Sequence, residues 1–225
     1  MDRTLRPALV AEAIGTFIFF TVGAGAVIVT TYAAGGGGLV GVALAHGLAL
    51  AVLVSAFGAV SGGHFNPAVT VAVFVAGRIP AGRAAWYIVA QAAGALAAGL
   101  LLRYIFSEAV WQPTHLGTPG LGPDITQTMG IVIEAVATLL LVFAVLGTAV
   151  DPRGPKIGGL AIGLAIAADI LFAGPLTGAA MNPARWFGPA IVSGFTDDWY
   201  VWIVGPLAGA IVAGWLWRYV FAERT

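Results

Sequence analysis

Long apolar stretches separated by short polar segments dominate this chain. A helix needs about 20 apolar residues to cross the hydrocarbon core of a bilayer. Stretches of roughly that length run near residues 8–31, 39–60, 84–106, 128–150, 157–173 and 199–221. The pattern therefore predicts an all-α membrane protein with six transmembrane helices.

Two further apolar pieces, residues 67–77 and 183–194, are too short to cross the membrane. Each begins with proline, which suits the first position of a helix because its missing N–H would have no partner there. We expect two re-entrant half-helices, each followed by a transmembrane helix.

An internal repeat links the two short pieces. The segment Ser61–Ala68 recurs in outline as Thr177–Ala184, 116 positions later (182 minus 66). Each copy contains three spans, and because three is odd, the second copy must cross the membrane in the opposite sense. We predict a single domain over 1–225, built as an inverted 3+3 repeat (about 1–112 and 127–225), with its functional site near the midplane.

Composition supports membrane residence and excludes several other classes. The chain is 60% hydrophobic and 9% charged, which is too little polar surface for a soluble globule of this size. Lys plus Arg equals Asp plus Glu, so bulk charge gives no case for a nucleic-acid partner. Cysteine is absent, and no metal-ligand spacing, phosphate loop or catalytic triad rises above chance. We expect no cofactor, no metal and no enzymatic activity.

The basic residues orient the chain, because Lys and Arg in short loops favour the cytoplasmic side. If the six helices alternate, one side receives Arg3, Arg6, Arg78, Arg83, Arg153, Lys156, Arg218 and Arg224. Segments 32–38, 107–127 and 194–198, on the other side, contain no Lys or Arg. We expect a multi-pass protein in contact with membrane lipid, with both termini cytoplasmic, in a prokaryotic cell membrane.

The asparagines of this chain are Asn66 and Asn182, and each precedes Pro-Ala at the start of a half-helix. One such tripeptide could be ordinary capping, since Asn is a good N-cap and Pro a good first residue. Two copies related by inverted topology point instead to a shared functional role.

Arg185 follows the second Asn-Pro-Ala segment, and Glu12 and Glu134 occupy equivalent places in spans one and four. With these residues the chain resembles the aquaporins, or major intrinsic proteins, over essentially its whole length. The resemblance implies a water channel that assembles as a homotetramer with one pore per subunit. It also implies that the two half-helices meet end to end at the membrane centre.

At that meeting point the positive ends of both half-helix dipoles would oppose cations and hopping protons. Each asparagine can cap its own half-helix while its amide donates to a passing water. Glu12 and Glu134 are costly inside apolar helices unless their oxygens find partners. A proton relay is one explanation for them; the resemblance implies instead that they brace the re-entrant loops, with His64 helping.

The resemblance further implies an outer selectivity filter, which consists of His46, Ile170, Ala179 and Arg185. The topology places His46 and Ile170 in the outer half of the membrane, within reach of Arg185. Alternatively, His46 is an ordinary core histidine and Ile170 packs against lipid.

This quartet is most similar to that of tonoplast intrinsic proteins, some of which pass ammonia as well as water. The loop segment Pro113-Thr114-His115 also resembles theirs, which implies that His115 helps shape the filter; it could equally be an ordinary exposed loop histidine. The chain departs from that subfamily at Asp169 and Trp186.

We therefore expect passive single-file permeation of water and ammonia, with protons and ions excluded. Glycerol facilitators usually carry an aromatic pair in the filter and Asp after the arginine, where this chain has Trp186. A glycerol or other small-solute facilitator remains the first alternative. A secondary transporter is the second, because inverted repeats and intramembrane glutamates occur there too.

Overall fold

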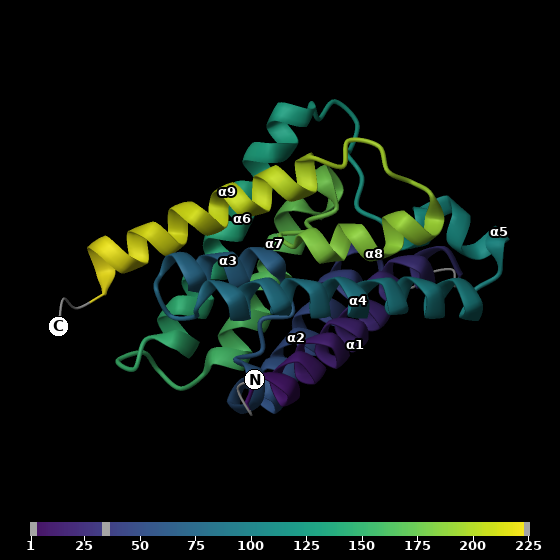
Figure 1. The fold of residues 1–225 in the computed structure, drawn as a ribbon. Helices are drawn as coiled ribbons and strands as arrows, with labels where there is room; N and C mark the ends of the chain where they lie inside the picture. Colours follow the sequence, from purple (N-terminus) through teal and green to yellow (C-terminus); the bar gives the residue numbers. More distant parts are fainter. Residues whose placement is uncertain (1–3, 33–36, 223–225) are drawn as a thin grey trace.

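A computed structural model describes residues 4–32 and 37–222 of the chain (Figure 1). Within these residues six helices are long and apolar enough to span a membrane. They are α1 (Leu5–Tyr32), α2 (Gly38–Ser61), α4 (Ala81–Ile105), α6 (Gln127–Val145, prolonged by a π-helical turn to Val150), α7 (Gly158–Thr177) and α9 (Val201–Leu216, prolonged likewise to Phe221). The predicted all-α architecture with six spans is confirmed.

The two half-helices are α3 (Pro67–Val75) and α8 (Pro183–Ser193). Both begin at the predicted proline, and the preceding asparagine caps each one through its side-chain oxygen. Figure 1 shows α3 and α8 extending to opposite sides from the centre of the molecule. The loop after α4 holds a short helix, α5 (Glu108–Trp111), and a 3-10 segment, Gln112–Gly117, which the sequence pattern did not predict.

Glycines allow the spanning helices to approach closely. A Cβ atom at Gly94 of α4 would lie 2.3 Å from the Ala13 carbonyl oxygen of α1, and one at Gly209 of α9 would lie 2.2 Å from the Ala135 carbonyl oxygen of α6. Any larger residue would push these helix pairs apart. The order of two spans, a half-helix and a third span occurs twice, as α1–α4 and α6–α9. The exact limits of the repeats, 1–112 and 127–225, stay a prediction.

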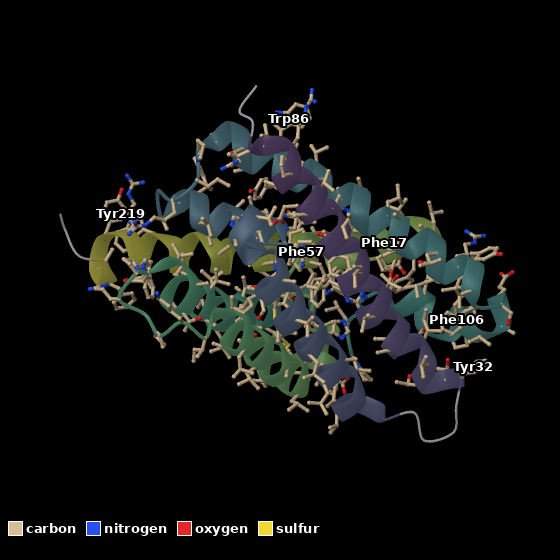
Figure 2. The ribbon with its side chains drawn as sticks, turned by 90° about the horizontal axis from the view of Figure 1, so that it is seen from below. Phe17, Tyr32, Phe57, Trp86, Phe106 and Tyr219 are labelled. Atoms are coloured by element: carbon tan, nitrogen blue, oxygen red, sulfur yellow. The ribbon has the colours of Figure 1, made fainter. Side chains whose placement is uncertain are left out.

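Basic side chains link several segments at one end of the bundle. Arg83 donates to Thr4 at the start of α1, and Arg153 donates to the Phe221 carbonyl beyond α9. The first helix therefore begins at the same end as the α3–α4 connection, and the last helix ends beside the α6–α7 loop. Arg3 and Arg224, which also entered the orientation argument, lie outside the described residues. At the other end, Tyr32 and Phe106 pack edge to face where α1 and α4 end (Figure 2).

Glu12 of α1 lies under the loop that leads into α3. Its Oε1 accepts hydrogen bonds from the Ser61 hydroxyl at 2.6 Å and from the His64 backbone N–H at 3.0 Å. Its Oε2 accepts from the Phe65 backbone N–H at 2.7 Å and from the Gln91 amide at 2.8 Å. The side chain is fully buried, so these four donors replace its water.

Glu134 of α6 repeats the arrangement under the loop that leads into α8. Its Oε1 accepts from the Thr177 hydroxyl at 2.7 Å and from the Ala180 N–H at 2.9 Å, and its Oε2 accepts from the Met181 N–H at 2.6 Å. Every acceptor oxygen is thus committed to the loop. These are the contacts that a brace requires, whereas a proton relay needs an oxygen that is free to exchange protons.

Replacing Glu134 with Gln tests the brace. The amide nitrogen cannot accept a hydrogen bond, so at least one buried loop N–H loses its partner, at a cost of about 1–3 kcal/mol. We expect a lower midpoint of thermal unfolding for the purified protein in detergent, with Glu108→Gln at an exposed position as the control. An unchanged midpoint together with a loss of proton-coupled transport would instead identify a relay.

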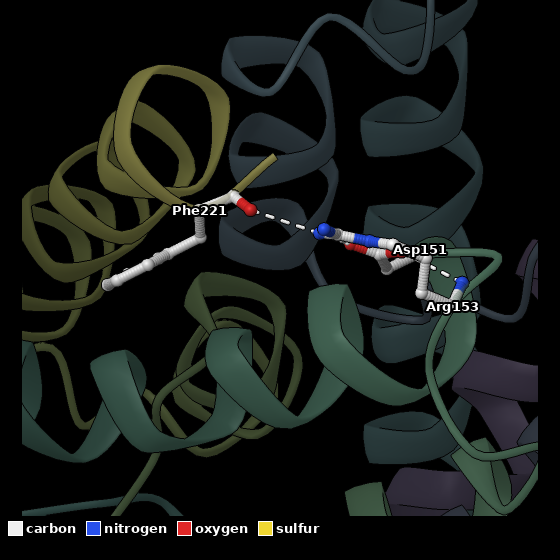
Figure 3. Close-up of polar contacts among 3 residues, drawn as sticks. All are labelled: Asp151, Arg153 and Phe221. Carbon is white, nitrogen blue, oxygen red and sulfur yellow. Dashed lines mark hydrogen bonds and ion pairs between the residues drawn. The ribbon is translucent and has the colours of Figure 1, made fainter. Parts of the chain in front are cut away.

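Asp151 and Arg153 link the α6–α7 loop to Phe221, the last residue of the final span (Figure 3). The Arg153 guanidinium donates to both Asp151 carboxylate oxygens, at 2.9 and 2.6 Å, and to the Phe221 carbonyl at 3.0 Å. These side-chain hydrogen bonds, with one from the Arg153 backbone N–H, lower the pKa of Asp151 to about 2. The ionised carboxylate is therefore the form that stabilises this loop.

The stabilisation by Asp151 should depend on pH. Because the folded-state pKa lies below the ordinary 3.8, the contribution is complete above that value and disappears as the pH falls through about 2. We expect Asp151→Asn to unfold at a lower temperature than the wild type at pH 6, with the difference closing toward pH 2. A difference that stays constant over this range, as expected for the exposed control Glu108→Gln, would contradict the assignment.

Candidate functional site

A very narrow passage lies at the centre of the bundle, where the two half-helices begin. It has a volume of about 10 Å³ and is lined by residues that include Phe19, Leu50, His64, Asn66, Ile166 and Asn182. A cavity in which the centre of a water molecule can occupy about 10–15 Å³ holds one water molecule. Apart from the asparagines and His64, the side chains named here are apolar, so a solute at this point finds few polar partners.

Asn66 and Asn182 bind each other's loops across the passage. The Asn66 amide donates to the Met181 carbonyl at 2.9 Å, and the Asn182 amide donates to the Phe65 carbonyl at 3.0 Å. Each Oδ1 accepts from the N-terminus of its own half-helix, at 2.8 Å from Ala68 N in the first case. One N–H of each amide is thus used by the fold, and the second is available to the lumen. The sequence did not reveal these links between the repeats.

The residue before each asparagine has a left-handed backbone. Phe65 has φ 48° and Met181 has φ 49°, which is uncommon for residues other than glycine. Strained backbone of this kind persists only where surrounding contacts determine it, and here both N–H groups are held by the buried glutamates. The strain is what presents the Phe65 and Met181 carbonyls to the opposite asparagine.

A larger cavity of about 390 Å³, the outer cavity, lies about one helical turn from the passage along α7 and α8: Ile170 and Arg185 line it, whereas Ile166 and Asn182 line the passage. Val42, Gly117, Ile170, Gly178 and Arg185 are among its lining residues. The buried Arg185 side chain is held at two points: its Nε donates to His46 Nε2 at 3.2 Å, and its Nη1 donates to the Gly117 carbonyl at 2.8 Å. The remaining guanidinium N–H groups can serve solutes in the cavity.

His46 has both ring nitrogens occupied. Its Nδ1 lies 2.9 Å from the Val42 carbonyl, which can only accept, so the proton is on Nδ1 and Nε2 accepts from Arg185. The ring therefore orients Arg185 and has no N–H left for a solute. Gly23 makes room for it, since a Cβ atom there would lie 2.4 Å from Nε2. Sequence reasoning did not single out Gly23, and only the packing distance identifies it.

The other two predicted filter residues, Ile170 and Ala179, are both buried. Ile170 is buried and lines the same outer cavity. Ala179 is buried in the loop before Asn182, with φ 46° and its N–H donating to the Thr177 hydroxyl at 3.2 Å. Arg185 and His46 are in direct contact, and Ile170 shares the cavity with Arg185.

His115 does not line the outer cavity. Its exposed ring stacks on Phe195, with centroids 3.9 Å apart and an interplanar angle of 6°. The same loop reaches Arg185 through Gly117, whose carbonyl accepts a hydrogen bond from the guanidinium. The structure thus brings the His115 loop to Arg185 of the predicted filter, but through the backbone and not through the imidazole.

An inner cavity of about 780 Å³ lies on the other side of the passage, and Asp151 and Lys156 are among its lining residues. His64 lines both this cavity and the passage. Its Nδ1 lies 3.0 Å from the Thr70 hydroxyl, and its ring packs edge to face against Tyr87. The imidazole is therefore held at the inner mouth while its backbone N–H is held by Glu12.

Asp169 and Trp186 are the two departures noted in the sequence. Asp169 is buried, and its Oδ2 has no hydrogen-bond partner within residues 4–32 and 37–222; nothing in the structure explains its role. Trp186 stacks on Trp202 of α9.

Three plant aquaporins align with nearly the whole chain. "Aquaporin TIP4-4" of Zea mays is 45% identical over 224 residues, covering 96% of this chain and 87% of that protein. "Probable aquaporin TIP2-2" of Oryza sativa subsp. japonica is 42% identical over 223 residues, covering 95% and 87%. "Aquaporin NIP1-1" of Zea mays is 39% identical over 213 residues, covering 94% and 74%.

The fold matches a solved structure, the aquaglyceroporin from Plasmodium falciparum, with a TM-score of 0.82 and 96% of each chain covered. The two sequences are 21% identical, so this likeness establishes the architecture alone. The family model described as "Major intrinsic protein" matches residues 3–217. With this match and with relatives up to 45% identical over nearly its whole length, the chain belongs to the major intrinsic protein family.

Proposed function

We propose that this membrane channel passes water in single file, admits ammonia and excludes protons and ions. The observation that carries the proposal is the central passage of about 10 Å³, which both asparagines line and which lies between two much larger cavities. A solute must shed its bulk water there and cross one molecule at a time. Membership of the family, with relatives named aquaporins, supports a passive channel and not an enzyme.

Proton exclusion rests on the asparagines and the half-helix dipoles. The free N–H of Asn66 and that of Asn182 donate to the oxygen of a passing water, so this oxygen can accept no hydrogen bond from the neighbouring waters. The hydrogens of the same water then point along the pore and can only donate to its neighbours. The N-termini of α3 and α8 add positive potential at the same point, equivalent to about half an elementary charge each. A hopping proton therefore loses both its hydrogen-bonded chain and its favourable field.

The proposed filter consists of Arg185, His46, Ile170 and Ala179. Arg185 supplies the N–H donors, His46 fixes their direction, and Ile170 forms an apolar wall. Neutral ammonia is similar to water in size and accepts a hydrogen bond from Arg185, whereas ammonium meets the same positive charge as any other cation. His115 contributes through the loop that presents the Gly117 carbonyl to Arg185.

The alternatives are less well supported by the site. The filter lacks the aromatic pair that would line a wall for the carbon chain of glycerol, and Trp186 stands where facilitators usually have Asp. Glu12 and Glu134 do not support a proton-coupled transporter, because the loop donors occupy both oxygens of each carboxylate. We therefore favour a channel with poor glycerol permeability.

The proposal also covers the oligomeric state of the channel and its orientation in the membrane. The apolar helices and the family make the chain an integral, multi-pass membrane protein. Homotetramerisation is proposed from the family, and cytoplasmic termini from the basic residues gathered at one end. A prokaryotic cell membrane stays a prediction that the relatives named above, all from plants, do not support.

Replacing Arg185 with Val tests the filter. Removing the guanidinium widens the constriction and removes its charge, so glycerol flux should rise by about tenfold from a low wild-type value. Water permeability should stay substantial, because the asparagine passage is unchanged. Stopped-flow light scattering of proteoliposomes measures both. Loss of all water flux in a folded variant, or wild-type glycerol flux equal to that of a dedicated facilitator, would contradict the proposal.

Ammonia permeation can be measured as internal alkalinisation of liposomes after an ammonium gradient is applied. The double variant His46→Phe with Ile170→His removes the acceptor that orients Arg185 and puts a polar ring on the apolar wall. We expect its ammonia-to-water permeability ratio to fall by about threefold or more. His115→Ala should lower the ratio less, because the ring stacks on Phe195 outside the cavity. Equal ratios in all three proteins would leave a plain water channel.

A further inference from the structure

A buried pair of tryptophans lies directly behind the proposed filter. Trp186 follows Arg185 in the first turn of α8, and successive residues of a helix point about 100° apart. Arg185 therefore faces the outer cavity, while Trp186 is turned away from it into an apolar cluster with Ala190 and Trp202. Trp186 is 6% exposed and Trp202 is 1% exposed.

The two rings hold α8 against α9. Their centroids are 6.2 Å apart and their planes are inclined by only 6°, which is an offset parallel stack. Trp186 cannot move without displacing Trp202, and it shares its backbone with Arg185. The stack thus fixes the first turn of α8 on the side opposite the lumen.

Trp202 also holds the loop that carries Ala179. Its indole Nε1–H donates to the Thr177 carbonyl at 2.9 Å, and the Thr177 hydroxyl in turn accepts from the Ala179 N–H at 3.2 Å. Trp202 therefore contacts both α8, which carries Arg185, and the residue that precedes the loop with Ala179.

The first repeat anchors its half-helix in a different way. Thr70 is the fourth residue of α3, as Trp186 is of α8, counting from the proline. Gln91 of α4 donates to the Thr70 hydroxyl at 3.0 Å. Each half-helix is thus tied at the same position to the last span of its own repeat, through a hydrogen bond in one case and a ring stack in the other.

We propose that Trp186 and Trp202 are positioning residues that hold Arg185 and Ala179 at a fixed separation and so set the largest neutral solute that passes. This inference rests on the proposed filter. It assigns a role to Trp186, at which the chain departs from the subfamily it resembles, and it explains why an indole is buried there although its own N–H has no partner within the described part of the chain.

The test compares variants that remove one contact at a time. Trp202→Phe keeps a ring for the stack and loses the hydrogen bond to Thr177, whereas Trp186→Ala loses the stack. Trp186→Phe is the conservative match, because the Trp186 N–H has no partner to lose. Trp86→Phe, at an exposed position on α4 (Figure 2), controls for loss of any tryptophan.

The measurement is the ratio of glycerol to water permeability in proteoliposomes, at equal amounts of folded protein by gel filtration. We expect the ratio to rise by about threefold or more in Trp202→Phe and Trp186→Ala, and to stay near the wild-type value in Trp186→Phe and Trp86→Phe. A general loss of folded channels lowers both permeabilities together and leaves the ratio unchanged. If Trp186→Ala yields no folded protein, Trp202→Phe decides the matter.

Arg185→Val calibrates the experiment. If it raises the ratio and the two tryptophan variants do not, the positioning role is overturned while the filter stands. If Arg185→Val leaves the ratio unchanged, the filter assignment is wrong and the inference falls with it. A rise in Arg185→Val, Trp202→Phe and Trp186→Ala, without one in the two conservative variants, supports both.

Discussion

The structure depends on hydrogen-bond partners for backbone N–H and C=O groups that lie within the membrane but outside any helix. Unsatisfied N–H and C=O groups cost several kcal/mol in a hydrocarbon environment, so irregular backbone persists there only where protein or a wet cavity supplies partners. Glu12 and Glu134 supply acceptors for the loop N–H groups, and the asparagines supply donors for the carbonyls of Phe65 and Met181. With these partners the half-helices can start at the centre of the bundle and leave a passage between them.

The repeats share this solution and differ in what they add to it. Ser61 and Thr177 both donate to the buried glutamate of their repeat, at 2.6 and 2.7 Å. The first repeat adds His64 at the inner mouth, and the second adds Arg185 at the outer one. The shared contacts build the passage, whereas the added residues distinguish one end of the pore from the other.

The sequence predicted the features that local pattern determines. Helix length follows from the apolar stretches, and the start of each half-helix follows from Asn-Pro at residues 66–67 and 182–183. The sequence could not predict the contacts of His46. Its partners Val42 and Arg185 lie 4 and 139 residues away along the chain, and only the geometry shows which ring nitrogen accepts a hydrogen bond. The stack of His115 on Phe195 was hidden for the same reason: a loop residue carries no periodicity from which its direction can be read.

Ion exclusion and solute selection are carried by different parts of the pore. A solute entering from the outer cavity meets Arg185 first and the two half-helix N-termini next, and both present positive charge. A cation is therefore opposed twice, whatever the width of the opening. In the proposed mechanism, the apolar wall at Ile170 can therefore leave room for neutral ammonia without opening a path for ions. On the same proposal, the dimensions around Arg185 decide only which neutral molecules pass, and the stack of Trp186 on Trp202 sets those dimensions from outside the lumen.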